Sequence, residues 1–225
     1  MRNIPVFTTE NGVASLILRE IPYRRSAYCL IRDTQAPAAF AEECARFCLG
    51  AGAERVYATG HAALEQYPFH TSMLLMRRAR AGLEETDASL FPVTEETVEE
   101  WRELCNRRMD RVPNAAWMTE EDGREMLKKG DGYFVHRDGR LLGIGRASGD
   151  SIDQLASAVP GGGRDTLLAL AHGIFSDTIC LTVASTNAPA MRLYNSLGFQ
   201  PVRELSRWYI LSPCQGKTLD KEGAL

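Results

Sequence analysis

The chain has 225 residues, of which 44% are hydrophobic and 24% are charged, as in an ordinary globular protein. Its net charge of -3 gives no global reason to expect a nucleic-acid partner. No apolar run reaches the roughly 18 residues of a membrane span. The N-terminal sequence MRNIPVFTTENG lacks the apolar stretch of a secretory signal. We therefore expect a cytoplasmic protein that binds neither nucleic acid nor membrane.

The six cysteines are scattered and form no C-x-x-C pair; they are Cys29, Cys44, Cys48, Cys105, Cys180 and Cys214. Cys44 and Cys48 are one helical turn apart, a spacing that could in principle hold a metal ion. They also belong to an apolar helical stripe with Phe40, Phe47 and Ala51. Such a stripe favours buried thiols over metal ligands, so we predict no metal site.

Residues 1–82 are predicted to form a small N-terminal α/β domain. Alternating apolar and β-branched residues indicate its strands, and Gly50 marks the end of its helix. The predicted elements are strands within 4–33, a polar turn at Pro22–Arg25, a helix at Pro37–Leu49, and strands at 55–58 and 71–76. The charged stretch RRARAGLEETD at 77–87 is typical of a boundary, so we predict a second domain at 83–225.

The second domain is predicted to have the order β-α-α-β-β-β-α-β-α-β. Thr97-x-x-Glu100 and Thr119-x-x-Asp122 have the spacing of capping boxes that open two helices, and Asp138-Gly139 is typical of a hairpin turn. The other elements are strands at 91–93, 133–136, 141–147, 152–159, 179–184 and 202–211 and helices at 164–175 and 189–197. The strand–helix–strand run at 152–184 implies parallel strands, so we predict a mixed-sheet α/β (α+β) fold.

The segment 182–199 reads TVASTNAPAMRLYNSLGF. A strand followed by N-x-x-A-x-x-L-Y-x-x-L-G-F resembles the GCN5-related N-acetyltransferase (GNAT) family, and the element order over 88–212 agrees with that family's fold. The resemblance implies a mixed, mostly antiparallel GNAT-type sheet with flanking helices. Residues 1–80 resemble the strand–strand–helix–strand half of the same fold, which predicts a degenerate second copy.

The family resemblance implies that acetyl-CoA is the co-substrate and that Tyr194 lies near its sulfur. A phenol with a pKa of about 10 can protonate the thiolate that leaves when an amine attacks a thioester. The alternative is that Tyr194 is a core aromatic residue. Asn187 has two interpretations as well: a helix-start residue, or a contact of the pantetheine arm.

The glycine-rich segment VPGGGRDTLL at 159–168 joins a predicted strand to a predicted helix. Glycines let the backbone approach an anion, and N–H groups at a helix start can bind a pyrophosphate. The family pattern at this junction is Q/R-x-x-G-x-G/A, but Ala158 stands at the Q/R position and Asp165 adds negative charge. The segment could also be a flexible glycine turn.

The resemblance thus implies one set of cofactor-binding residues along the predicted strand, the glycine-rich segment and the last helix. They are Leu155, Ala156, Ser157, Val159, Gly161, Gly162, Gly163, Arg164, Asp165, Thr166, Asn187 and Tyr194.

The acceptor amine is cationic near neutral pH and must lose a proton before it attacks. The family resemblance implies that the general base is a carboxylate on or near the strand at 152–159, or a water relayed to one. The resemblance also implies a V-shaped cleft between the strands at 152–159 and 179–184. Asp153 is the nearest candidate base to this cleft, with Asp150 and Glu204 as alternatives. We therefore predict Tyr194 and Asp153 as the catalytic pair.

Three functions remain open at the level of sequence. The first is an acetyltransferase that acts by direct attack on a small amine, a peptide N-terminus or a lysine, as a monomer or homodimer. The second is a CoA-binding regulatory protein that has lost transfer activity. The third is an unrelated α/β nucleotide binder that uses the glycine-rich segment. The identity of the acceptor cannot be read from the sequence.

Overall fold

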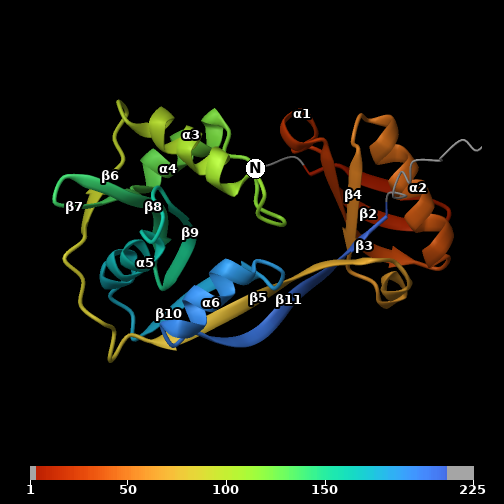
Figure 1. The fold of residues 1–225 in the computed structure, drawn as a ribbon. Helices are drawn as coiled ribbons and strands as arrows, with labels where there is room; N and C mark the ends of the chain where they lie inside the picture. The colour runs from red at the N-terminus through yellow and green to blue at the C-terminus, as the bar shows by residue number, and fades with distance from the viewer. Residues whose placement is uncertain (1–3, 212–225) are drawn as a thin grey trace, which may run out of the picture. The chain divides into compact units, whose positions relative to one another are not determined.

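The computed structural model describes residues 4–211, which divide into two compact units (Figure 1). Of the described residues, 4–69 and 208–211 form unit 1, and 70–207 form unit 2. This division differs from the predicted boundary after residue 82, because the strand that ends at Ala79 pairs with a strand of unit 2 from Met73 to Ala79. The final strand, in turn, ends in unit 1.

Unit 1 combines antiparallel hairpins with one parallel strand pair. Its elements are β1 (Val6–Thr9), β2 (Gly12–Ile17), α1 (Ile21–Arg24), β3 (Ser26–Thr34), α2 (Pro37–Gly50), β4 (Arg55–Thr59) and the 3-10 helix η1 (Ala62–Gln66). β1, β2 and β3 pair antiparallel, whereas β3 and β4 run parallel with α2 as the crossover. Tyr209 and Ile210 of the final strand pair with β4.

The short helix α1 was not predicted, because Pro22–Arg25 has the composition of a turn. Pro22 occupies the first helical turn, where its missing N–H costs nothing. Arg25 ends the helix in the left-handed conformation at φ 50°. The polar turn predicted here is therefore replaced by one turn of helix.

The elements of unit 2 are β5 (Phe69–Ala79), β6 (Ser89–Pro92), α3 (Val98–Met109), α4 (Glu120–Lys129), β7 (Gly132–Arg137), β8 (Arg140–Ser148), β9 (Ser151–Ser157), α5 (Gly163–His172), β10 (Thr178–Ala184), α6 (Ala188–Ser196) and β11 (Gln200–Ile210). From β6 to β11, unit 2 has the predicted element order, and it also contains β5, which was predicted to belong to the N-terminal domain. Within the unit the strand order is β11-β5-β10-β9-β8-β7-β6. The pairs β5–β10, β6–β7, β7–β8 and β8–β9 are antiparallel and the pair β9–β10 is parallel, which confirms a mixed, mostly antiparallel sheet.

Only one of the two predicted capping boxes forms. At the start of α4, Thr119 and Asp122 exchange hydrogen bonds as a capping box does. At the start of α3, Thr97 makes no cap hydrogen bond to the helix; its hydroxyl instead accepts from the Thr94 N–H at 3.0 Å. The reason is local: Thr97 already has a helical backbone (φ -111°, ψ -5°) rather than the extended backbone of an N-cap.

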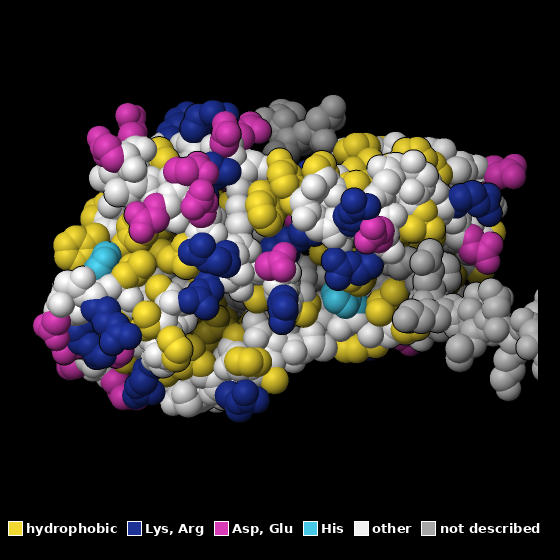
Figure 2. All heavy atoms as spheres, turned by 45° about the horizontal axis from the view of Figure 1, so that its top comes forward, with side chains coloured by type: hydrophobic (Ala, Val, Ile, Leu, Met, Phe, Trp, Pro, Cys, Tyr) yellow, Lys and Arg dark blue, Asp and Glu magenta, His cyan; other side chains and the backbone are white. Residues whose placement is uncertain are grey.

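Helices cover both faces of the central strands of unit 2 (Figure 1). On one face, α5 and α6 build a core around Leu167, Leu170 and Phe199. On the other face, α3 and α4 build a core around Trp101 and Met126. The space-filling view shows hydrophobic side chains interspersed with Lys and Arg on the visible surface of this unit (Figure 2).

The cysteines of the described chain are buried and free, as predicted for core thiols. Cys29 and Cys48 bring their Sγ atoms to 3.7 Å in the core of unit 1. Cys214 lies outside the described residues. Within 4–211, no group of three or more His, Cys, Asp or Glu side chains is arranged to hold a metal ion, and no helix has the length and hydrophobicity of a bilayer span.

Candidate functional site

β9 and β10 start as a parallel pair and then separate. They are in register only at Ser151–Cys180 and Ile152–Leu181. Beyond these pairs the strands enclose a cleft of about 620 Å³. This is the size range of small-molecule sites in proteins, about 300–1,000 Å³. The predicted opening between the two strands is therefore present.

The cleft walls come mainly from four segments of unit 2, which are β9, β10, α6 and the region from the end of α3 toward α4, with Met73 of β5 and Gly163 of α5 in addition. They are mostly apolar, with contributions from Met109, Val112, Leu155, Leu181, Val183 and Leu193. Among the described residues that line the cleft, Asp153 is the one carboxylate and Arg108 the one basic side chain.

Tyr194 lies in the wall of this cleft, on α6. The helix is positioned by Asn187, whose Oδ1 accepts the Ala190 N–H at 3.3 Å, and it ends before Gly198 at φ 80°. The tyrosine is 8% exposed, and its hydroxyl has no hydrogen-bond partner among residues 4–211. Burial raises the pKa of Tyr194 to about 12, so the phenol stays protonated at physiological pH.

The structure confirms one of the two interpretations predicted for Asn187. It is the N-cap of α6, and it also lines the cleft. Its carboxamide therefore has a structural task that does not depend on a ligand, and contact with a ligand stays a prediction.

Asp153 sits where β9 has a bulge. Arg146 pairs with Gln154 and Ala147 with Ile152, so Asp153 has no partner on β8. Such bulges redirect side chains and are frequent beside active sites. The Asp153 carboxylate accepts hydrogen bonds from the Ser148 and Ser151 hydroxyls, each at 2.9 Å.

The two alternative bases lie elsewhere. Asp150 accepts a hydrogen bond from the Cys180 thiol at 3.5 Å. Glu204 pairs with Arg207 on β11 at 3.1 Å, which holds the pKa of that carboxyl below its usual range. Neither is among the residues that line the cleft. The geometry thus favours Asp153 over both alternatives.

The glycine-rich segment turns sharply from β9 into α5. Gly161 has φ 80°, a left-handed conformation that favours glycine. A Cβ on Gly162 would lie 2.4 Å from the Leu142 carbonyl oxygen, so this position admits only glycine without a shift. The Thr166 N–H bonds to the Gly162 oxygen, which leaves the N–H groups of the first turn of α5 without helical acceptors.

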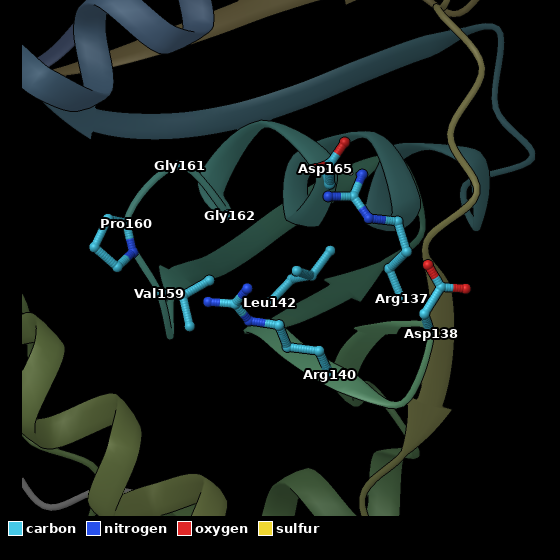
Figure 3. Close-up of a pocket in the computed structure, with 9 residues that line it drawn as sticks. All are labelled: Arg137, Asp138, Arg140, Leu142, Val159, Pro160, Gly161, Gly162 and Asp165. Atoms are coloured by element: carbon cyan, nitrogen blue, oxygen red, sulfur yellow. Dashed lines mark ion pairs between the residues drawn. The ribbon is translucent and has the colours of Figure 1, made fainter.

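A second cavity of about 480 Å³ lies beside this segment (Figure 3). Val159, Gly161 and Gly162 line it together with Arg137 and Arg140 of the β7–β8 hairpin. Arg137 lies beside Asp165 in the close-up and pairs with that carboxylate at 3.2 Å. The negative charge of Asp165 is thus compensated by a basic side chain from the hairpin.

The predicted cofactor-binding residues fall into three groups. The cleft is lined by Leu155, Ala156, Ser157, Gly163, Asn187 and Tyr194. The second cavity is lined by Val159, Gly161, Gly162 and Asp165. Arg164 and Thr166 line neither: Arg164 pairs with Glu84, and fully buried Thr166 donates its hydroxyl to the Gly162 oxygen at 2.7 Å.

Sequence reasoning missed four polar residues beside these cavities: Arg108, Arg140, Asn114 and Gln154. Both carboxamide atoms of Asn114 and the Oε1 of Gln154 are buried and have no hydrogen-bond partner among the residues that the structure describes, and both residues line the cleft. The one usable sequence signal was the PN pair at Asn114, because Asn tolerates the left-handed backbone it adopts here at φ 57°.

No protein-family model matches the sequence, and no curated protein has a significantly similar sequence. Solved structures do match. A functionally unknown conserved protein from Staphylococcus epidermidis has 10% identity and a TM-score of 0.60, with 92% of this chain and 93% of that chain covered. A GCN5-related N-acetyltransferase from Sphaerobacter thermophilus has 13% identity and a TM-score of 0.53, with 89% and 77% covered.

A putative acetyltransferase from Pyrococcus horikoshii has 13% identity and a TM-score of 0.54, with 90% of this chain and 69% of that chain covered. At these identities the likeness concerns the backbone alone. Together with the mixed sheet and the diverging β9–β10 pair, it leads to one conclusion: the chain has the fold of the GCN5-related N-acetyltransferases.

Proposed function

We propose that the protein is an N-acyltransferase that moves an acetyl group from acetyl-CoA to a primary amine. The observation that carries this proposal is the cleft between β9 and β10 with a protonated tyrosine in its wall. A GNAT-type fold supports it, but fold alone does not fix function.

The residues present fit a long, thin, amide-containing cofactor. Since β10 pairs with β9 only at its start, the edge of β9 from Leu155 to Ser157 is free to hydrogen-bond pantetheine amides. The first turn of α5 offers backbone N–H groups suited to phosphate oxygens. Bound there, CoA would supply an acyl group activated as a thioester.

Two side chains would handle the protons. Asp153 accepts a proton from the acceptor ammonium, which frees the nitrogen lone pair to form the C–N bond. Tyr194 holds a proton on its phenol oxygen and donates it to the sulfur as the C–S bond breaks. As the amide forms, the nitrogen gives its second proton to solvent, and the phenolate regains a proton from solvent. Because its pKa is raised to about 12, Tyr194 is a proton donor and not a base.

A coupled assay tests the proposal. The protein is incubated with acetyl-CoA and a panel of small amines, peptides with free N-termini and lysine peptides, and thiol release is followed with a thiol-reactive dye. Amine-dependent thiol release with an acetylated product by mass spectrometry is the expected result. No stabilisation by acetyl-CoA in a melting experiment, with stabilisation by ATP or NAD, would contradict it.

A second function is favoured by one observation: the loop that should hold the pyrophosphate has Ala158 at the position where the family pattern has Q/R. A CoA-binding regulatory protein would tolerate such a loss more readily than an enzyme. Tight acetyl-CoA binding without turnover on any amine of the panel would support that function.

A further inference from the structure

We propose that Arg108 and Arg140, both outside the glycine-rich segment, supply the positive charge that holds the phosphate groups of CoA. This inference rests on the proposed function. A pyrophosphate carries more than one negative charge, whereas a helix start offers only about half an elementary positive charge. Residues 158–163 contribute no basic side chain of their own.

Four arginines of the described chain lie around this segment, and two of them are already neutralised. Arg164 pairs with Glu84. Arg137 pairs with Asp165 at 3.2 Å and with Asp87 at 3.4 Å. A further anion would have to compete with these carboxylates for either side chain.

The side chain of Arg108 contacts Ala158, the position where the family pattern has Gln or Arg. It lies in the last turn of α3, and its Nη2 donates a hydrogen bond to the Ala158 carbonyl oxygen. It forms no ion pair within residues 4–211, and it is the basic residue of the cleft wall. A guanidinium has five N–H donors, so the bond to Ala158 leaves donors for a phosphate.

Arg140 approaches the same segment from the hairpin between β7 and β8. It lines the second cavity with Gly161 and Gly162, and it too has no ion pair in the described part of the chain. In the close-up its side chain extends past Leu142 toward Val159, while Arg137 turns to Asp165 (Figure 3). One unpaired guanidinium therefore borders each of the two cavities that flank the segment.

The test compares two ligands that share the acetylated pantetheine arm and differ in phosphates. Calorimetry measures the Kd of acetyl-CoA and of S-acetylpantetheine for the wild type, Arg108→Ala, Arg140→Ala and the double variant. We expect each single change to raise the Kd of acetyl-CoA about tenfold, as for a lost charge-assisted hydrogen bond. The Kd of S-acetylpantetheine should change by less than about twofold, because the ligand has no phosphate to lose.

Arg107→Ala is the matched control, since Arg107 is an exposed neighbour on α3 that lines neither cavity. Ala158→Arg in the Arg108→Ala background should restore most of the affinity for acetyl-CoA. If the Kd of acetyl-CoA is unchanged in Arg108→Ala, Arg140→Ala and the double variant, this inference is overturned and the proposed function is not. The same holds if both ligands lose affinity by the same factor. Failure of the wild type to bind acetyl-CoA would overturn the proposed function and this inference with it.

Discussion

Residues 4–211 contain two parallel strand–helix–strand crossovers, one closed and one open. In unit 1, β3 and β4 stay paired from Ser26–Arg55 to Leu30–Thr59, and α2 seals them with Phe40 at 0% exposure. In unit 2, β9 and β10 separate after two pairs and leave the cleft. The same topology thus gives a packed core in one unit and a candidate site in the other.

The difference comes from local features and not from topology. The bulge at Asp153 bends β9 at the point where pairing with β10 ends. Opposite β9, the cleft is lined by small residues, among them Ala184 of β10 and Ala190 of α6, whose side chains do not fill the space between the strands. α5 begins at glycines that approach the β8 backbone closely, whereas α2 begins at Pro37.

The largest effect is expected at the tyrosine of the open crossover. Tyr194→Phe should lower kcat at least about 100-fold, the usual minimum for loss of a general acid, while the Kd of acetyl-CoA stays within about twofold. Steady-state kinetics and calorimetry check the two values. Full turnover in this variant would remove the acid role from Tyr194.

A large side chain in the open crossover should block binding of acetyl-CoA, whereas a large side chain in the closed crossover should destabilise the fold. Ala190→Phe is expected to raise the Kd of acetyl-CoA at least about tenfold with little change in the free energy of unfolding. Ala58→Phe, in the packed core of unit 1, should destabilise by about 1–3 kcal/mol through overpacking. Calorimetry and urea denaturation separate the outcomes; equal destabilisation by both would mean that the cleft is closed in solution.

The glycines at the start of α5 should respond with opposite signs. Gly162→Ala places a Cβ 2.4 Å from the Leu142 oxygen and should cost about 1–3 kcal/mol of stability. The Cβ added by Gly163→Ala meets the Leu193 Cδ2 at 3.4 Å and the Ser157 Cβ at 3.9 Å, and the change should stabilise by about 0.5–1 kcal/mol, because alanine favours the helix. Denaturation of both variants gives the free energies. Stabilisation by Gly162→Ala would show that the approach to β8 is looser than described.

The two helices beside the open crossover provide a smaller contrast. Thr119→Ala removes the capping box of α4 and should cost about 1 kcal/mol of unfolding free energy. Thr97→Ala should cost less than about 0.5 kcal/mol, since Thr97 makes no cap hydrogen bond to α3. Equal losses in thermal denaturation would contradict the different helix starts.

This pair of helix starts shows how far sequence reasoning reaches. Both threonines have the same spacing to an acidic residue, so the pattern predicts two capping boxes, and only the backbone angles at Thr97 reveal that one is absent. The element order of unit 2 and the parallel β9–β10 pair could be predicted, because hydrophobic periodicity and crossover topology are local properties.

The electrostatic surroundings of the site could not be predicted. Arg108 meets Ala158 across 50 positions of the chain, and Arg140 reaches the glycine-rich segment from a different hairpin. No spacing rule connects such residues. Likewise, the bulge that leaves Asp153 unpaired appears only once the register between β8 and β9 is known.

We also predict that kcat does not change with pH in the range where an ordinary tyrosine titrates. The pKa of Tyr194 is raised to about 12 by burial, so the phenol remains protonated well above its ordinary pKa of about 10. With an acceptor that is already neutral, kcat should stay flat between about pH 8 and 10. A fall in kcat centred below about pH 9.5 that disappears in Tyr194→Phe would contradict the assignment.

Hydrogen exchange of the backbone amides tests the open crossover most directly. On addition of acetyl-CoA, amides of β9 between Leu155 and Ser157 and of the first turn of α5 should exchange more slowly, while those of β3 and β4 stay unchanged. Exchange that slows in β3 and β4 instead, or in neither crossover although the ligand is bound, would contradict the assignment of the β9–β10 cleft as the CoA site.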